Sequence, residues 1–126
     1  MSEANVTTNT MPPGHEPATK ASAYAFILSA GFWLLVGTLY ALLAAVKLFW
    51  PDVLAFSIFS FGRIRPIHTN VVMFGWSSFA LMGLALYIVT RMSKVNMVRR
   101  GAAKFGLVLW NIALAAILIS LSLGIT

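Results

Sequence analysis

The fold is decided by residues 67–90, which read IHTNVVMFGWSSFALMGLALYIVT. This stretch contains no aspartate, glutamate, lysine or arginine, and its one histidine, His68, lies next to its beginning. A helix needs about 20 predominantly apolar residues to cross the hydrocarbon core of a bilayer. Residues 67–90 are therefore predicted to form a transmembrane helix, with Pro66 in its first turn, where a missing N–H is tolerated.

Two further apolar runs lie on either side of this helix, at residues 22–48 and 105–125. The first ends with Lys47, whose ammonium group can reach the membrane interface. The last contains Asn111, for which we expect an interhelical hydrogen bond. The aromatic-rich residues 52–62 are too few to cross a bilayer and are predicted to be an interfacial connector. The sequence thus predicts an all-α membrane protein in which the three apolar runs form three transmembrane helices.

Composition and charge agree with this class of protein. Hydrophobic residues make up 60% of the 126 residues and charged residues only 10%, whereas a soluble domain has about 25% charged residues. The net charge is +6, but the cations lie in short clusters between apolar runs, so we expect a lipid bilayer and no nucleic acid as partner. The chain has no cysteine, which excludes disulfides, thiolate–metal sites and covalent haem attachment to this chain.

The distribution of lysine and arginine predicts the orientation. Residues 1–21 are polar and rich in proline, so we expect a flexible tail. The tail contributes Lys20, and residues 91–104 contribute five cations and no acid. The opposite side carries only three cations: Lys47, Arg63 and Arg65. The positive-inside rule therefore predicts a cytoplasmic amino terminus.

The candidate site is the stretch FGRIRPIHTN at residues 61–70. Imidazole is a common protein ligand of haem iron, so His68 is the candidate metal ligand. A haem also brings two propionates, and arginine pairs with carboxylates through two parallel hydrogen bonds. Arg63 and Arg65, which precede His68 at the interface, are therefore the candidate propionate-binding residues. No residue is assigned a catalytic role.

Each of these residues also has a structural interpretation. An interfacial histidine is often a hydrogen-bonded structural residue, and interfacial arginines often bind lipid headgroups. Val71, Val72, Gly75, Trp76 and Phe79 share a helical face with His68. Gly75 on this face could make room for a macrocycle or allow two helices to pack closely. The residues alone leave these alternatives open.

The stretch at residues 61–70 closely resembles the catalytic subunit I of cbb(3)-type cytochrome c oxidases, in the haem–copper oxidase superfamily. In that family a Gly-Arg-x-Arg-Pro-x-His-Thr stretch opens the second transmembrane helix. The resemblance extends to residues 32–40, 87–91 and 121–126, so the three predicted helices resemble helices I–III of subunit I. It implies that His68 is an axial ligand of the low-spin haem b and that Arg65, and less directly Arg63, contact haem propionates.

The same resemblance implies a bacterial inner-membrane complex that reduces oxygen with electrons from cytochrome c-type subunits and contributes to proton translocation. The chain has no histidine after His68, so a second imidazole ligand, the high-spin haem and the copper are expected on remaining subunit I helices or on a partner membrane chain. By itself the chain is not expected to be catalytically complete. The alternatives are a nitric oxide reductase-like subunit, a haem-free membrane scaffold or assembly subunit, and a parallel homodimeric cytochrome b.

Overall fold

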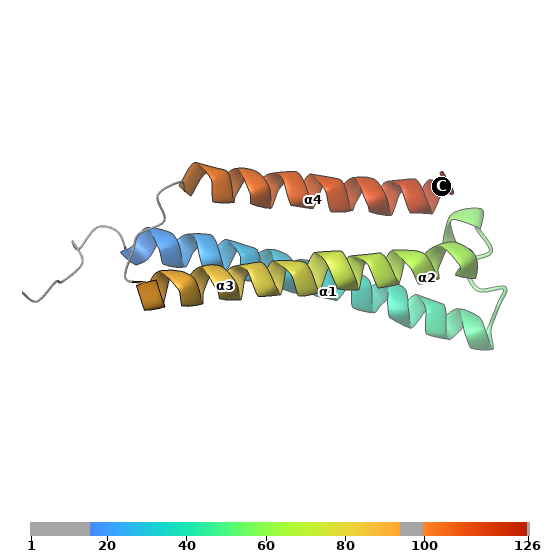
Figure 1. Cartoon of the computed structure of the whole chain (residues 1–126). Helices are drawn as coiled ribbons and strands as arrows, with labels where there is room; N and C mark the ends of the chain where they lie inside the picture. Colours follow the sequence, from blue (N-terminus) through green and yellow to red (C-terminus); the bar gives the residue numbers. More distant parts are fainter. Residues whose placement is uncertain (1–15, 94–99, 126) are drawn as a thin grey trace, which may run out of the picture.

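The computed structural model describes residues 16–93 and 100–125, and the side chains of residues 20–93 and 101–125. Within these ranges every regular element is a helix. Three helical rods run antiparallel to their neighbours in sequence (Figure 1). Each contains a segment long and apolar enough to span a membrane, at Lys20–Phe49, Phe61–Ser93 and Gly101–Leu123. The predicted all-α architecture with three transmembrane helices is therefore confirmed.

Helix α1 spans Glu16–Phe49, so it begins six residues before the apolar run from which it was predicted. Pro17 is its second residue, where the absent N–H has no helical partner to lose. At 1.5 Å per residue its 34 residues measure about 50 Å, well beyond a bilayer core of about 30 Å. The extra turns therefore project beyond the apolar layer. The rest of the predicted flexible tail, residues 1–15, lies outside the described residues.

The second rod joins three contiguous elements: α2 at Phe61–Asn70, a π-helical segment η2 at Val71–Ser77, and α3 at Ser78–Ser93. The rod starts earlier than expected because the carbonyl of Ser60 accepts hydrogen bonds from the N–H groups of Arg63, at 2.9 Å, and Ile64, at 3.0 Å. Pro66 is therefore the sixth residue of α2, and its predicted place in the first turn is wrong. Its ring removes the donor that the carbonyl of Gly62 would otherwise receive, and Gly62 is exposed.

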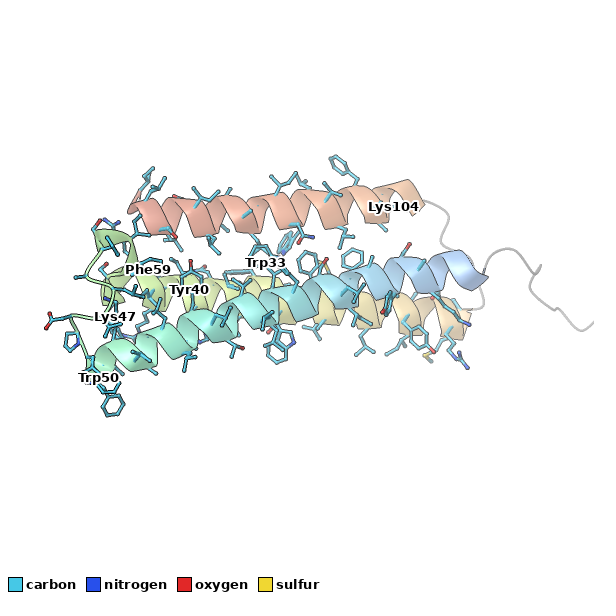
Figure 2. The ribbon with its side chains drawn as sticks, turned by 180° about the vertical axis from the view of Figure 1, so that it is seen from behind. Trp33, Tyr40, Lys47, Trp50, Phe59 and Lys104 are labelled. Carbon is cyan, nitrogen blue, oxygen red and sulfur yellow. The ribbon has the colours of Figure 1, made fainter. Side chains whose placement is uncertain are left out.

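The connector between the first two rods lies at residues 50–60, two positions earlier than the predicted 52–62. It consists of a turn at residues 51–54 and the short 3-10 helix η1 at Ser57–Phe59. Lys47 is buried and donates a hydrogen bond of 3.2 Å to the carbonyl of Leu54, which has a positive φ of 53°. The ammonium group therefore anchors the connector at this end of the molecule (Figure 2).

Glycines set the distance between α1 and the second rod. A Cβ placed on Gly75 would lie 2.7 Å from the Cβ of Trp33, and one placed on Gly83 would lie 3.1 Å from the Cβ of Phe26. Small residues at such positions allow helix backbones to approach in a membrane. Of the two interpretations of Gly75, close helix packing is the one that the structure supports.

Helix α4, at Arg100–Leu123, lies along one side of this pair (Figure 1). Leu114 belongs to the same buried cluster as Trp33 and Phe79. The indole N–H of Trp33 donates to Oδ1 of Asn111 at 2.8 Å, and Figure 2 shows Trp33 on the side of α1 that faces α4. The predicted interhelical hydrogen bond of Asn111 is confirmed.

Candidate haem-ligand site

His68 lies in the second turn of α2 and is half-buried against α1. Its Nδ1 is 2.8 Å from the carbonyl oxygen of Gly37. A carbonyl oxygen can only accept a hydrogen bond, so Nδ1 carries the proton and donates it. In the neutral imidazole the other nitrogen, Nε2, then holds its lone pair unprotonated. This is the arrangement in which histidine ligands bind metals, with the second ring nitrogen hydrogen-bonded to a fixed acceptor.

The two residues that follow His68 stabilise the helix around the proline. Thr69 donates its hydroxyl to the carbonyl of Arg65 at 3.1 Å, and Asn70 donates its amide to the carbonyl of Pro66 at 2.8 Å. Both are bonds to the residue four positions earlier. The polar sequence His-Thr-Asn is therefore engaged by backbone carbonyls throughout, which satisfies polar groups where lipid offers none.

The π-helical segment η2 follows directly, and it explains which side chains lie on the inner face. Buried residues recur at every fourth position: Ile67, Val71, Gly75, Phe79 and Gly83. In an ideal α-helix a step of four drifts by about 40° around the axis. A π segment contains more residues per turn and reduces this drift. Trp76, which was predicted to share the face of His68, lies outside this buried row and is 41% exposed.

Side chains from η2, the start of α3 and α4 bind the irregular backbone of this segment. The hydroxyls of Ser77 and Ser78 donate to the carbonyls of Val72 and Met73, five residues earlier, at 3.3 and 3.2 Å. The indole of Trp110 donates to the carbonyl of Phe74 at 3.0 Å. The segment is thus held both by its own rod and by the third rod.

Arg63 is directed to the end of α4. Its Nη1 donates to the carbonyl of Ser122 at 3.0 Å. The same helix end is closed by Gly124, which has a φ of 75°, and by a bond of 3.0 Å from the N–H of Ile125 to the carbonyl of Ser120. This pattern is a Schellman motif, and Arg63 supplies a donor to a carbonyl that the motif leaves open. A cation there also interacts favourably with the helix dipole.

Arg65 differs from Arg63 in its surroundings, since its side chain is exposed. It precedes His68 by three residues, a spacing that places two side chains on neighbouring positions of one helix face. Of the three predicted site residues, the structure therefore brings Arg65 and His68 to one side of α2, and it engages Arg63 with the third rod.

Sequence reasoning missed Gly37 as the hydrogen-bond acceptor of His68, because a backbone carbonyl leaves no trace in a residue pattern. It also missed the π segment, because the step of four becomes visible only when the structure shows which residues of this uniformly apolar stretch are buried. No group of three or more His, Cys, Asp or Glu side chains that could hold a metal occurs in the part of the chain that the structure describes. His68 would therefore need ligands from elsewhere.

Comparison with known proteins agrees with the resemblance drawn from residues 61–70. Residues 21–126 match the family described as Cytochrome C and Quinol oxidase polypeptide I. The chain belongs to this family. It is therefore a relative of the oxidase subunits I, and a multi-pass membrane protein.

Three relatives illustrate how much of the family the chain covers. The Cbb3-type cytochrome c oxidase subunit CcoN1 of Stutzerimonas stutzeri is 34% identical over 103 residues, which are 80% of this chain and 22% of the relative. A bacteroid cytochrome c oxidase subunit 1 homolog of Bradyrhizobium diazoefficiens is 33% identical over 99 residues, 77% of this chain and 18% of the relative. A homolog from Agrobacterium tumefaciens is 34% identical over 71 residues, 56% of this chain and 13% of the relative. The chain thus spans less than a quarter of the length of these relatives.

Proposed function

We propose that the chain supplies one axial ligand, His68, to a low-spin haem b in a cbb(3)-type cytochrome c oxidase. The observation that carries the proposal is the bond of 2.8 Å between Nδ1 of His68 and the carbonyl of Gly37, because it leaves Nε2 as the ligating nitrogen. The family and the similarity to a cbb3-type subunit support the oxidase context. When bound, the haem carries single electrons between its ferrous and ferric states.

In this proposal the three site residues have different roles. His68 presents Nε2 to the iron. Arg65 pairs with a haem propionate at the membrane interface, where its charge and planar fork suit a carboxylate. Arg63 contributes to the site indirectly, since its guanidinium is already bound to the end of α4. The second imidazole, and the residues that bind the high-spin haem and the copper, are supplied from outside this sequence.

The whole-complex activity follows from the same proposal. The complex reduces oxygen to water with electrons from cytochrome c-type subunits and contributes to proton translocation. It lies in the bacterial inner membrane, with the amino terminus in the cytoplasm. The orientation rests on the cations of residues 91–104, of which Lys94 and Arg99 lie outside the described residues. Figure 1 places both helix ends that adjoin this loop at the same end as the start of α1.

The test uses the complex purified through a tag on this chain, with mass spectrometry of its subunits and reduced-minus-oxidised spectra. His68→Ala should abolish the low-spin b-type absorption while the subunits still co-purify. His15→Ala, which removes the only other histidine, should leave the absorption unchanged. If the wild-type chain purifies without haem, or if His68→Ala keeps the full absorption, the proposal is wrong and a haem-free scaffold is the better account.

A further inference from the structure

We propose that Gly37 is a positioning residue for the ligand His68. Its carbonyl selects the tautomer and orientation of the imidazole, and its lack of a side chain is what allows the carbonyl to reach Nδ1. The consequence for haem rests on the proposed function. The consequence for the tautomer does not, because it concerns only residues of this chain.

The chemical part of the inference concerns the two nitrogens of His68. Free neutral histidine in water favours the Nε2–H tautomer, in which Nε2 is a donor and cannot bind a metal. The bond from Nδ1 to the carbonyl of Gly37 requires the opposite tautomer. A helical carbonyl can accept this second bond because it has two lone pairs. An acceptor on Nδ1–H also raises the basicity of Nε2 as a ligand.

The steric part concerns the space in front of Gly37. A Cβ added there would lie 2.8 Å from Cγ2 of Val72 and 3.4 Å from Cγ1 of Val71. Val72 is four residues after His68, so it lies one turn further along the same side of the second rod. A side chain at position 37 must displace Val72 or push α1 away from that rod, and when α1 moves the carbonyl moves with it.

The chain contains matched control positions for this effect. A Cβ at Gly31, on α1, meets nothing within 4 Å, so Gly31→Ala changes the same residue type without a clash. A Cβ at Gly75 would lie 2.7 Å from the Cβ of Trp33. Gly75→Ala therefore disturbs the packing of the same two rods without touching the partner of His68. Val72→Ala removes the methyl group that Gly37→Ala would strike, which makes the double variant a rescue.

The first measurement is made on the full chain in bilayers without haem. The chain has two histidines, so labelling histidine with 15N and the glycine carbonyls with 13C, in a His15→Asn background, isolates His68. In alkaline buffer, where imidazole is neutral, the 15N shifts should report the Nδ1–H tautomer. A dipolar coupling should join Nδ1 to the carbonyl of a glycine. A dominant Nε2–H tautomer in the unmodified chain would overturn the proposal.

The variants then separate positioning from packing. Gly37→Ala should weaken the dipolar coupling and shift His68 toward the Nε2–H tautomer. Gly37→Ala/Val72→Ala should restore the original spectrum, and Gly31→Ala should leave it unchanged. If Gly75→Ala alters the tautomer as much as Gly37→Ala does, the effect is general packing and the positioning role is wrong.

The second measurement is the midpoint potential of the low-spin haem in the purified complex. Gly37→Ala should raise this potential, because a less basic imidazole stabilises ferric iron less, and the double variant should restore it. An unchanged potential in Gly37→Ala would overturn the haem part of the proposal. Failure of the proposed function looks different: the wild-type complex would then show no haem that depends on His68, while the tautomer would still be decided by the haem-free measurement.

Discussion

Nη1 of Arg63 lies 3.0 Å from the carbonyl oxygen of Ser122 and donates a hydrogen bond to it. The bond joins the beginning of the second rod to the end of the third across 59 residues of sequence. Because the α4 end is closed by Gly124 and bound by Arg63, the start of α2 is tied to α4 just five residues before His68. Arg63 thus helps to fix the segment that carries the candidate ligand.

Arg63→Ala should therefore lower the free energy of unfolding. A hydrogen bond from a charged donor contributes about 1.5–3 kcal/mol, and partial exposure of Arg63 reduces the expected loss to about 1–2 kcal/mol. The measurement is denaturant titration in mixed micelles, followed by the fluorescence of the four tryptophans. The unfolding free energy of Arg63→Lys should lie between those of the wild type and Arg63→Ala, since lysine keeps the charge near the helix end but lacks the planar guanidinium.

Arg65→Ala is the matched control, and it should affect the haem rather than the stability of the chain. Arg65 is exposed, so its removal should leave the unfolding free energy within about 0.5 kcal/mol. In the purified complex it should shift the potential of the low-spin haem or lower its occupancy. Equal loss of stability in both variants, or haem loss only in Arg63→Ala, would contradict the division of roles between these two arginines.

Gly124→Ala should destabilise the chain by about 1–2 kcal/mol, because an L side chain at a φ of 75° is strained. The new Cβ would also lie 2.6 Å from Nη2 of Arg63 and displace the guanidinium. Gly106→Ala is the control, inside the second turn of α4, where a Cβ meets nothing within 4 Å. It should be neutral or stabilising, since alanine favours a helix interior over glycine by about 0.5–1 kcal/mol. If titrations show that both variants change the unfolding free energy in the same direction, this account of the helix end is contradicted.

Hydropathy alone predicted the three rods, because the length and apolarity of a span are properties of sequence. Their ends were less predictable. The start of α2 at Phe61 depends on the carbonyl of Ser60 accepting two N–H groups, and Pro66 suggested a later start. The beginning of α1 was missed because a helix that leaves the apolar layer needs no further hydrophobic residue.

The candidate site was predictable as a set of residue types but not as a set of partners. Histidine, two arginines and a proline within a few residues pointed to His68. The sequence could not show that Arg63 reaches α4, because that bond depends on how the third rod packs. Nor could it show that the carbonyl of Gly37 accepts from His68. In both cases the partner is a backbone carbonyl, a group that every residue carries and that a pattern of side chains therefore does not mark.

Trp33 and Asn111 should be energetically coupled. Their hydrogen bond of 2.8 Å joins α1 to α4, and such bonds in membranes average about 0.6 kcal/mol with a maximum near 1.7. Trp33→Phe keeps most of the ring that packs on Gly75 but removes the indole donor. A double-mutant cycle with Asn111→Leu should give a coupling energy of about 0.5–1.5 kcal/mol. Strictly additive losses would mean that the bond contributes nothing to the association of these helices.

Trp110→Phe should loosen the π segment without unfolding the chain. The variant removes the donor to the carbonyl of Phe74, at 3.0 Å, while Ser77 and Ser78 of the second rod still bind the segment. If losing this hydrogen bond lowers the free energy of local opening by about 0.6 kcal/mol, amide exchange becomes roughly threefold faster. The increase should be confined to residues near 71–79. Hydrogen–deuterium exchange in bilayers measures this.

Trp76→Phe serves as the comparison for Trp110→Phe, because Trp76 lies in the same π segment but is 41% exposed to the surroundings. It removes an indole of the same size without removing the bond to Phe74. The exchange rates of residues 71–79 should therefore stay at the wild-type values. If both variants accelerate exchange equally, ring volume rather than the indole donor stabilises the segment.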